Sequence, residues 1–284
     1  MTAVLTHSAG SPPTTVSART SDSRCVQLWY DLGEIPAGWG PSVVTVGVFD
    51  GVHRGHRHLI GRAVREGRRR GLPTVLVTFD PHPARVLGVD RDTAALSSVE
   101  HRAELAAGLG VDAVCVLRFT RELAALSPTR FAAHVLAGTL HARAVVVGTN
   151  FTFGARGAGT RDTLVELGER YGFTVHGVGL LPVADDTACS STYTRRCLRD
   201  GDLRETTRAL GRPHRVDGRL HCGVVTVAEN TALPPAGHYT GAVDGRPAVV
   251  EVTDQRTLHL YASGSADEQV RAVAVTFHDR IGFL

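Results

Sequence analysis

Short apolar runs rich in β-branched residues alternate with longer amphipathic stretches over the first two-thirds of the chain. We predict strands at residues 43–48, 73–79, 111–117, 142–147 and 173–178, and helices at residues 55–70, 99–109, 128–139, 161–171, 192–200 and 203–210. Asp202 is the expected N-cap of the last helix. The regular alternation of strand and helix predicts an α/β domain, a Rossmann-like doubly wound parallel sheet.

The pattern changes after Pro213, where short strands follow one another without a strong helical signal. We predict these strands near residues 221–227, 237–243, 247–253, 256–261 and 270–277. They indicate a small all-β, barrel-like domain. At the other end, residues 1–24 are rich in Ser, Thr, Pro and Gly without apolar periodicity, which is typical of a disordered tail. We therefore expect a tail at 1–24, an α/β domain at 25–213 and a β domain at 214–284.

Composition limits the classes of partner and the location. The formal net charge is +3, and the one basic cluster lies on the helix predicted at 55–70, where a solvated face is the simpler interpretation, so we expect no nucleic-acid partner. No apolar run reaches the roughly 20 residues that span a bilayer, and the N-terminus lacks signal-peptide order, so we expect a cytoplasmic protein without a membrane partner. The oligomeric state stays open, with a homo-oligomer as one option.

Cysteine and lysine usage narrows the chemistry. The five cysteines are scattered without a CxxC pair, which argues against a zinc site and a disulfide framework. The sequence contains no lysine. A cation that meets phosphate must therefore be an arginine, a protonated histidine, a metal ion or a helix N-terminus.

A glycine-punctuated turn joins the first strand to the first helix over residues 43–56. His53 and His56 stand three residues apart where the helix begins, so both imidazoles can face one anion at the positive end of the helix dipole. Glycines in this turn let the backbone approach a nucleotide closely. This HxGH motif, directly after a strand, predicts a nucleotide-phosphate site. The other residues of the turn that we expect at the nucleotide are Gly47, Phe49, Asp50, Gly51 and Gly55.

A second phosphate-binding segment is predicted at residues 190–195. Ser190, Ser191 and Thr192 precede a helix, where hydroxyls and free amides can hold phosphate oxygens. Arg195 follows one turn later and offers a planar cationic group. Because we place both His53 and Arg195 at the crevice, we expect the protein to fold when either is replaced.

Two further segments follow strands, and the ligand crevice of an open α/β sheet lies outside the carboxyl ends of its strands. Residues 78–83 end in His82 and Pro83, and residues 147–154 contain Asn150 and Phe153. Asn150 could bind a phosphate or a ribose, and a phenylalanine could stack on a planar ring. Phe151 and Phe153 alternate along a strand end, so we expect one to face the crevice and the other to enter the core.

Four segments carry a resemblance to a known family. They are GVFDGVHRGH (47–56), TFDPHP (78–83), VGTNFTFG (147–154) and SSTYTR (190–195), with LSPTRF at 126–131 between them. In this order they closely resemble the adenylyltransferase module of bacterial bifunctional riboflavin kinase/FAD synthetases. The resemblance extends from about residue 26 to residue 213, roughly two-thirds of the chain.

The resemblance implies that ATP and FMN are the substrates and that Mg²⁺ bridges the phosphates. ATP would bind across the HxGH and SSTYTR segments, with His53 and His56 stabilising charge on the transferring phosphate. Asn150, Ser191, Thr192 and Arg195 would hold the nucleotide phosphates. FMN would lie beside Asn150 and Phe153, with His82 and Pro83 as further acceptor candidates and Phe153 as the ring platform. Thr194 stands where the family usually has an aliphatic residue.

The C-terminal part departs from the family's flavokinase barrel. The expected GFPTAN-like segment is absent, and residues 224–230 read VVTVAEN. The later strand that should carry a catalytic glutamate reads RTLHLY at 256–261, without a carboxylate. We therefore expect a degenerate kinase domain and no riboflavin kinase activity, with the barrel serving packing or oligomer contacts.

Three functions are compatible with these motifs. The first is FMN adenylyltransferase, in which ATP and FMN give FAD and pyrophosphate. The second is a diverged paralogue that transfers AMP or CMP to a different phosphorylated acceptor. The third is a catalytically silent flavin- or nucleotide-binding protein, against which the presence of His53, His56 and Arg195 argues.

Overall fold

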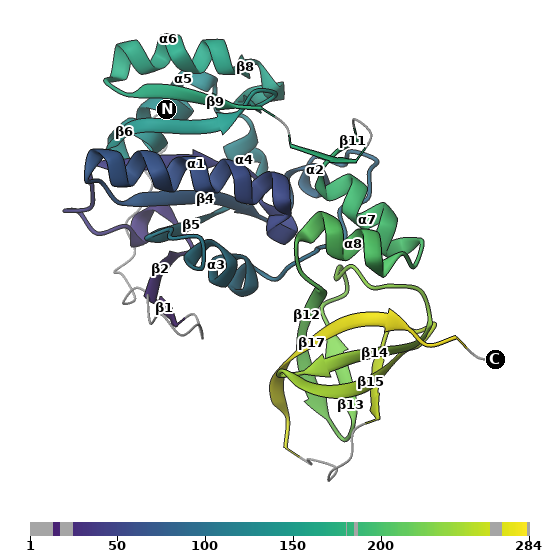
Figure 1. The fold of residues 1–284 in the computed structure, drawn as a ribbon. Coiled ribbons are helices and arrows are strands. Elements are labelled where there is room, and N and C mark those ends of the chain that lie inside the picture. The colour runs from purple at the N-terminus through teal and green to yellow at the C-terminus, as the bar shows by residue number, and fades with distance from the viewer. Residues whose placement is uncertain (1–13, 18–24, 180, 185–186, 262–268, 283–284) are drawn as a thin grey trace. The chain divides into compact units, whose positions relative to one another are not determined.

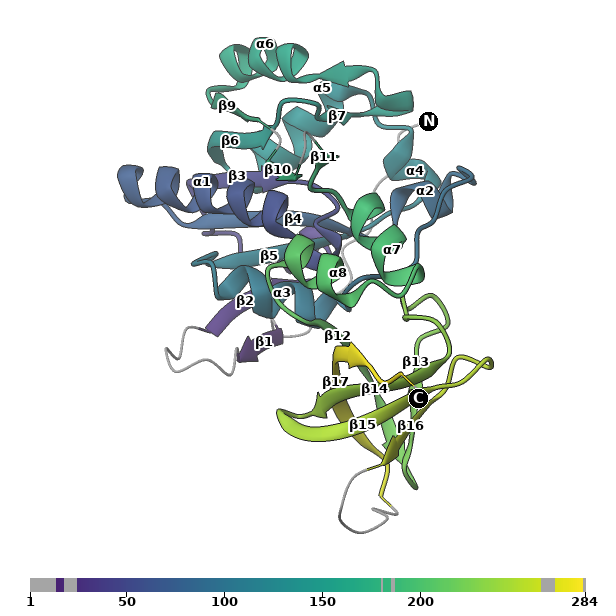
Figure 2. The same ribbon diagram turned by 45° about the vertical axis from the view of Figure 1, so that its right-hand side comes forward.

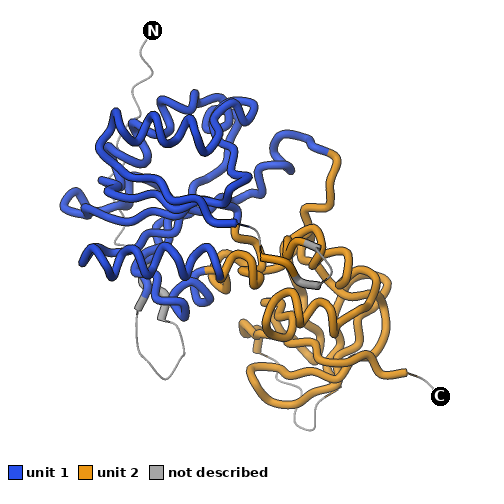
Figure 3. The backbone as a smooth tube through the Cα atoms, turned by 45° about the horizontal axis from the view of Figure 1, so that its top comes forward, with its two compact units in different colours: residues 1–48, 58–89, 103–179 blue, residues 49–57, 90–102, 180–284 orange. Residues whose placement is uncertain are grey.

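The computed structural model describes residues 14–17, 25–179, 181–184, 187–261 and 269–282. The chain forms two compact units (Figure 3), which we call the sheet unit and the barrel unit. The sheet unit comprises residues 1–48, 58–89 and 103–179, and the barrel unit comprises residues 49–57, 90–102 and 180–284. The HxGH turn and the segment 190–195 therefore belong to the same unit as the C-terminal β domain, a grouping that the sequence did not predict.

Six parallel strands form the main sheet of the sheet unit (Figure 1). Their order is β2 (Cys25–Trp29), β5 (Ala113–Arg118), β4 (Thr74–Asp80), β3 (Ser42–Val46), β6 (Ala142–Gly148) and β9 (Thr174–Val178). The chain builds outward from β3, first through β4 and β5 on one side and then through β6 and β9 on the other. This reversal confirms the predicted doubly wound sheet and places its switch point between β3 and β6.

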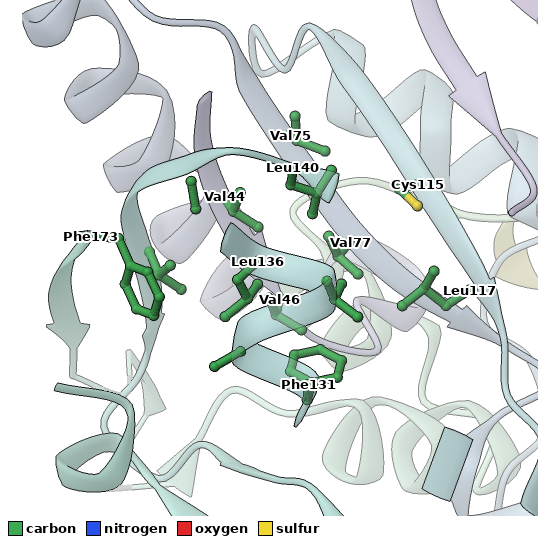
Figure 4. Packing of buried hydrophobic residues seen from close by; sticks show 14 of the residues in the cluster. Val44, Val46, Val75, Val77, Cys115, Leu117, Phe131, Leu136, Leu140 and Phe173 are labelled. Atoms are coloured by element: carbon green, nitrogen blue, oxygen red, sulfur yellow. The ribbon is translucent and has the colours of Figure 1, made fainter. Parts of the chain in front are cut away.

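Alternate residues of β3 pack on opposite faces of the sheet. Val43 packs with Ala63 of helix α1 (Arg54–Arg70). Val44 and Val46 face the other way and join a core with Leu136 of the π-helix η3 (Ala132–Thr139), as Figure 4 shows. Apolar residues on both faces explain why the run reads as continuously hydrophobic.

Most predicted helices of the α/β region have their expected places. Besides α1, they are α3 (Val99–Ala107), α6 (Arg161–Tyr171), α7 (Ser191–Arg199) and α8 (Leu203–Leu210). Asp202 caps α8, because its Oδ1 accepts a hydrogen bond from the Glu205 amide at 2.9 Å. The predicted helix 128–139 is instead α5 (Pro128–Phe131) followed by the wider turns of η3.

Several short elements were not predicted. Besides β2, they are β1 (Thr14–Ser17), η1 (Leu32–Glu34), η2 (Asp50–Val52), α2 (Pro83–Val86), α4 (Arg121–Ala124), β7 (Thr152–Phe153), η4 (Ala155–Gly157), β8 (Gly159–Thr160), β10 (Pro182–Ala184) and β11 (Thr187–Ala188). β1 pairs antiparallel with β2 and lies inside the expected tail, whose other residues fall outside the described part of the chain.

A closed six-stranded antiparallel barrel occupies the C-terminal region (Figure 2) and confirms the predicted all-β domain. Its strands run in the order β12 (His214–His221), β13 (Val224–Val227), β16 (Leu258–Tyr261), β15 (Arg246–Val252), β14 (Gly237–Val243) and β17 (Arg271–Arg280). Strand β12 was not predicted, and the strand predicted at 221–227 begins too early. Cys222 and Gly223 turn with φ of 47° and 77°, so the segment is a hairpin that joins β12 to β13. None of the described helices is both long and apolar enough to cross a membrane.

Candidate nucleotide site

The turn between β3 and α1 adopts an unusual backbone. Phe49, Gly51 and Val52 have left-handed φ values of 51°, 72° and 38°. A Cβ on Gly51 would lie 2.8 Å from the Leu96 Cβ, and one on Gly55 would lie 2.9 Å from the Cys189 carbonyl oxygen. Neighbouring protein atoms therefore leave no space for a side chain at either position. We had expected these glycines to make room for a nucleotide.

His53 and His56 form a stacked pair at the start of α1. Their ring centroids are 3.6 Å apart with an interplanar angle of 22°, and the buried Phe49 ring packs edge-on against His56 at 5.2 Å. His53 is 4% exposed, and His56 is half-buried. The two imidazoles thus lie together as the i, i+3 spacing indicated, with Phe49 supporting them from within the protein.

The hydrogen bonding of His53 fixes its tautomer. The His56 amide donates to His53 Nδ1 at 3.3 Å, so this nitrogen is an acceptor and the neutral ring carries its proton on Nε2. Burial lowers the pKa of His53 to about 4 and the pKa of His56 well below its ordinary value of 6.5. At neutral pH both rings are uncharged, so His53 offers an N–H donor instead of a cation.

The first residues of α7 lie against the same turn. Ser190 caps the helix, with its Oγ accepting from the Tyr193 amide at 3.1 Å, and the Ser191 hydroxyl donates to the Asp50 carbonyl oxygen at 3.1 Å. Thr192 is exposed, and its Oγ1 accepts from Arg91 at 3.2 Å. The hydroxyls are thus engaged with protein groups. The Tyr193 amide is taken by this cap, whereas the amides of Ser191 and Thr192 lack intrahelical partners and remain suited to an anion.

Thr194 causes no packing defect at its fully buried position. Its hydroxyl donates to the Ser190 carbonyl oxygen at 2.9 Å. The departure from the family's usual aliphatic residue is therefore accommodated by a local hydrogen bond.

Asp50 and Arg195 are buried partners of each other. The Arg195 Nη2 lies 2.5 Å from Asp50 Oδ2, and the side chains are 2% and 3% exposed. Asp50 also accepts from the amides of Leu96 and Ser97 at 3.0 and 3.2 Å, and Arg195 Nε donates to the Ala94 carbonyl at 2.6 Å. Asp50, which we had expected at the nucleotide, is therefore saturated by protein donors and positions the neighbouring segments.

Arg195 is less accessible than expected, since the pair with Asp50 covers most of its guanidinium. Its Nη1 is buried and has no hydrogen-bond partner within the described part of the chain. This geometry argues against the expectation that the protein folds without Arg195, because removal of the arginine would leave a buried carboxylate with reduced compensation.

Two contacts at this site were missed from the sequence. The Cys189 thiol donates to the Ala209 carbonyl at 3.3 Å and lies 3.6 Å from His53 Nδ1, and burial raises its pKa. The Ser97 hydroxyl accepts from the Gly51 amide at 3.0 Å. The one available signal was the position of Cys189 directly before the N-cap Ser190, whereas nothing in the sequence connects Ser97 to the turn.

The acceptor candidates and Gly47 belong to the sheet unit. The half-buried Gly47 donates its amide to the Val77 carbonyl at 3.1 Å. His82 caps α2 by accepting from the Ala84 amide at 3.1 Å, and Pro83 occupies the first helical turn. Asn150 is exposed.

Phe153 is the residue whose placement differs most from expectation. It is 7% exposed and belongs to the hydrophobic core, while Phe151 is half-buried. The two rings stack at 5.5 Å with an interplanar angle of 12°, so they do not point to opposite sides as the alternation argument required. Of the two, Phe151 is the ring with more surface to offer a ligand.

The donors at the site suit an anion better than a metal ion. They are imidazole, amide and guanidinium groups, and the carboxylate of Asp50 is occupied by protein donors. Across the described ranges, no three His, Cys, Asp or Glu side chains lie close enough to hold a metal ion.

Comparison with known proteins agrees with this chemistry. Residues 36–193 match the family model of FAD synthetase. The Escherichia coli K12 bifunctional riboflavin kinase/FMN adenylyltransferase is 34% identical over 216 residues, which cover 73% of this chain and 67% of the relative. Proteins of the same description from Listeria monocytogenes and Bacillus subtilis are 37% and 35% identical, with alignments that cover 68% and 62% of this chain and 58% and 55% of the relatives.

A solved structure shares the fold over nearly the whole chain. It is a crystal structure of a Streptococcus pneumoniae protein described as a macrolide-efflux protein, with a TM-score of 0.75 and 23% identity. The match covers 89% of this chain and 90% of that one. At this identity the likeness establishes the fold alone.

Proposed function

The chain belongs to the FAD synthetase family of nucleotidyltransferases, and we propose that it transfers AMP from ATP to FMN, giving FAD and pyrophosphate, without phosphorylating riboflavin. The observation that carries the proposal is the assembly of His53, His56 and the first turn of α7 around one turn of backbone. These groups come from two segments of the chain far apart in sequence, and all of them are suited to phosphate.

The reaction needs no covalent enzyme intermediate. An oxygen of the FMN phosphate attacks the α-phosphorus of ATP, a new P–O bond forms, and the bond to the leaving pyrophosphate breaks, with its electron pair remaining on pyrophosphate. Catalysis then rests on position and on stabilisation of spreading negative charge. His53 Nε2–H and the amides of Ser191 and Thr192 are the donors that we assign to the phosphates, with the buried, unpartnered Nη1 of Arg195 behind them. His56 supports the His53 ring by stacking and contributes a second imidazole.

Mg²⁺ would enter this site bound to the substrate phosphates. Mg²⁺ prefers oxygen ligands and commonly keeps several waters beside substrate phosphates. Because the donors at the site are themselves suited to anions, we assign the metal to phosphate oxygens and none of its ligands to a side chain. Bound there, Mg²⁺ would neutralise part of the triphosphate charge.

Two features of the barrel support the absence of kinase activity. Residues 224–227, at the place of the expected glycine-rich segment, form the regular strand β13. Strand β16 carries no carboxylate, and the nearby Glu251 of β15 accepts a hydrogen bond from Tyr261 at 2.6 Å. The relatives named above are bifunctional, so this chain would have lost one of their two activities.

A second candidate function differs from the proposed one in the acceptor of the nucleotidyl group. Transfer of AMP or CMP to another phosphorylated acceptor is favoured by the burial of Phe153, since the residue assigned to the isoalloxazine is not an open platform. A silent binding protein is disfavoured because it has no need of two stacked imidazoles at the start of α1.

A substrate panel tests the proposal. The purified chain is incubated with Mg²⁺, each of the four nucleoside triphosphates and a set of phosphorylated acceptors that includes FMN, and pyrophosphate release is followed. We expect release with ATP and FMN together, with FAD as the product. Pyrophosphate release only with CTP or only with a non-flavin acceptor would replace the flavin assignment by the second function. If no pair of substrates releases pyrophosphate, the protein is a catalytically silent binding protein.

A further inference from the structure

The HxGH turn depends on contacts outside itself. Val52 is β-branched and has a left-handed φ of 38°, a conformation that such residues rarely adopt. Backbone of this kind persists only where the surroundings hold it. Since His53 is the next residue, whatever holds the carbonyls of Gly51 and Val52 also decides where the His53 ring stands.

Arg212 binds both of these carbonyls. Its Nη2 donates to the Gly51 oxygen at 2.6 Å, and its Nη1 donates to the oxygens of Val52 and Leu210 at 3.3 and 3.2 Å. Burial lowers the pKa of Arg212 to about 10, which leaves it charged at neutral pH. A charged planar group therefore joins two successive carbonyls of the turn to the last residue of α8.

Arg212 lies in the short connection between α8 and the first strand of the barrel. Gly211 ends α8 with a φ of 71°, and β12 of the barrel begins at His214. The guanidinium thus reaches the HxGH turn from the junction between the helical region and the barrel.

A second connection joins the barrel to the turn. The Ala95 amide donates to the Asn230 carbonyl at 2.6 Å, and the Ala232 amide donates to the Ala95 carbonyl at 2.8 Å. The next two residues, Leu96 and Ser97, donate their amides to the Asp50 carboxylate. Leu96 also packs in the hydrophobic core of the barrel. The loop 230–232 therefore holds residues 95–97, and the amides of Leu96 and Ser97 in turn hold the Asp50 carboxylate in the HxGH turn.

We infer that Arg212 is a positioning residue for nucleotidyl transfer: it holds the HxGH turn by the carbonyls of Gly51 and Val52 and makes the barrel part of the framework that places His53. The barrel then has a role in the transferase reaction that is independent of any kinase site. The kinetic part of this inference rests on the proposed function, whereas the effect on His53 does not.

The test replaces Arg212 by Met in the full chain and compares two readouts. The first is kcat for pyrophosphate release, which we expect to fall on the order of 10- to 100-fold, the scale for misplaced catalytic groups, with a smaller change in the KM of the acceptor. The second is the set of ¹⁵N imidazole signals of His53 and His56, assigned with His53→Gln. We expect both to shift, while the signals of His259 on β16 stay in place.

The matched control is Arg208→Met. Arg208 lies on α8, is 54% exposed and pairs with Glu205 at 2.6 Å, so its loss should leave kcat and the histidine signals unchanged. Wild-type kcat and unmoved His53 signals in a folded Arg212→Met protein would overturn the inference. If that variant does not fold, Arg212→Lys decides: an ammonium lacks the planar geometry, so we expect an intermediate kcat, and wild-type turnover would reject the role. If the wild type itself shows no turnover, the proposed function fails, and the histidine signals alone decide whether Arg212 positions the turn.

Discussion

The Nη2 of Arg195 lies 2.5 Å from the Asp50 carboxylate, and both side chains are almost wholly buried. This ion pair links α7 to the turn that carries the histidines. A buried pair contributes little net stability compared with an apolar replacement, yet loss of one member leaves the other buried charge with reduced compensation. Arg195 is thus a structural partner as well as a candidate phosphate ligand.

We predict that Arg195→Ala destabilises the protein by about 3–5 kcal/mol, the scale for breaking a buried ion pair. Urea unfolding of the wild type and the variant measures the difference. Arg199→Ala is the control, because Arg199 is 64% exposed and lies 3.4 Å from Asp92. Its replacement should cost less than about 1 kcal/mol. Equal midpoints and slopes for Arg195→Ala and the wild type would show that the carboxylate tolerates isolation.

Replacement of His53 by Ala should lower turnover on the order of 100-fold, the usual cost of one lost donor to transition-state charge. The measurement is kcat for pyrophosphate release with saturating substrates. His58→Ala serves as the control, because His58 is exposed on the same helix. Near-normal kcat in a folded His53→Ala protein would remove this residue from the mechanism.

Stability should decline at mildly acidic pH. Burial lowers the pKa values of His53 and His214 to about 4 in the folded protein, against an ordinary 6.5. Because the unfolded chain takes up these protons first, the stabilisation is complete above pH 6.5 and is lost as the pH falls towards 4. We expect the free energy of unfolding to fall by about 2 kcal/mol for each of the two histidines between neutral pH and about pH 4.5.

His214→Phe isolates one of these contributions. Chemical unfolding at a series of pH values should give a shallower decline in the free energy of unfolding for the variant than for the wild type. The absolute stability is free to differ, since the variant also loses the 2.9 Å contact between Nε2 and the Ala232 carbonyl. Parallel curves would mean that His214 is not held neutral by the fold.

Riboflavin and ATP should give no FMN. The barrel has a regular strand at residues 224–227 where the family's glycine-rich segment is expected, and its strand at 258–261 has no carboxylate. Chromatographic detection of flavin products after long incubation with Mg²⁺ provides the measurement, with a bifunctional relative as the positive control. Any FMN above the level of a no-enzyme blank contradicts the prediction.

The paired rings of Phe151 and Phe153 should respond differently to truncation. Phe153→Ala removes a core side chain and should destabilise the fold by about 3–5 kcal/mol. Phe151→Ala should keep most of the stability and weaken FMN binding by roughly 1–3 kcal/mol, the range for a lost stacking contact. Fluorescence quenching of FMN measures the binding. Unchanged affinity in Phe151→Ala would remove Phe151 from the acceptor site.

The periodicity of the sequence determined the two architectures and most of the long helices. Strands and helices are local choices, set by residues within a few positions of one another, and so the pattern could be interpreted without the fold. The same holds for the HxGH motif, where a spacing of three residues on a helix brings His53 and His56 together. The hairpin at Cys222 was missed because cysteine is not a typical residue for a left-handed turn position.

Tertiary structure alone decided how the site is held. Asp50 and Arg195 are 145 positions apart in the sequence. Neither segment by itself indicates that the Asp50 carboxylate binds this arginine and two distant amides instead of a ligand. The burial of Phe153 and the contacts of Arg212 with the HxGH turn are likewise properties of packing. Local spacing determines which side chains can share a face, whereas burial and the choice of partner depend on chain segments that only the complete fold brings into contact.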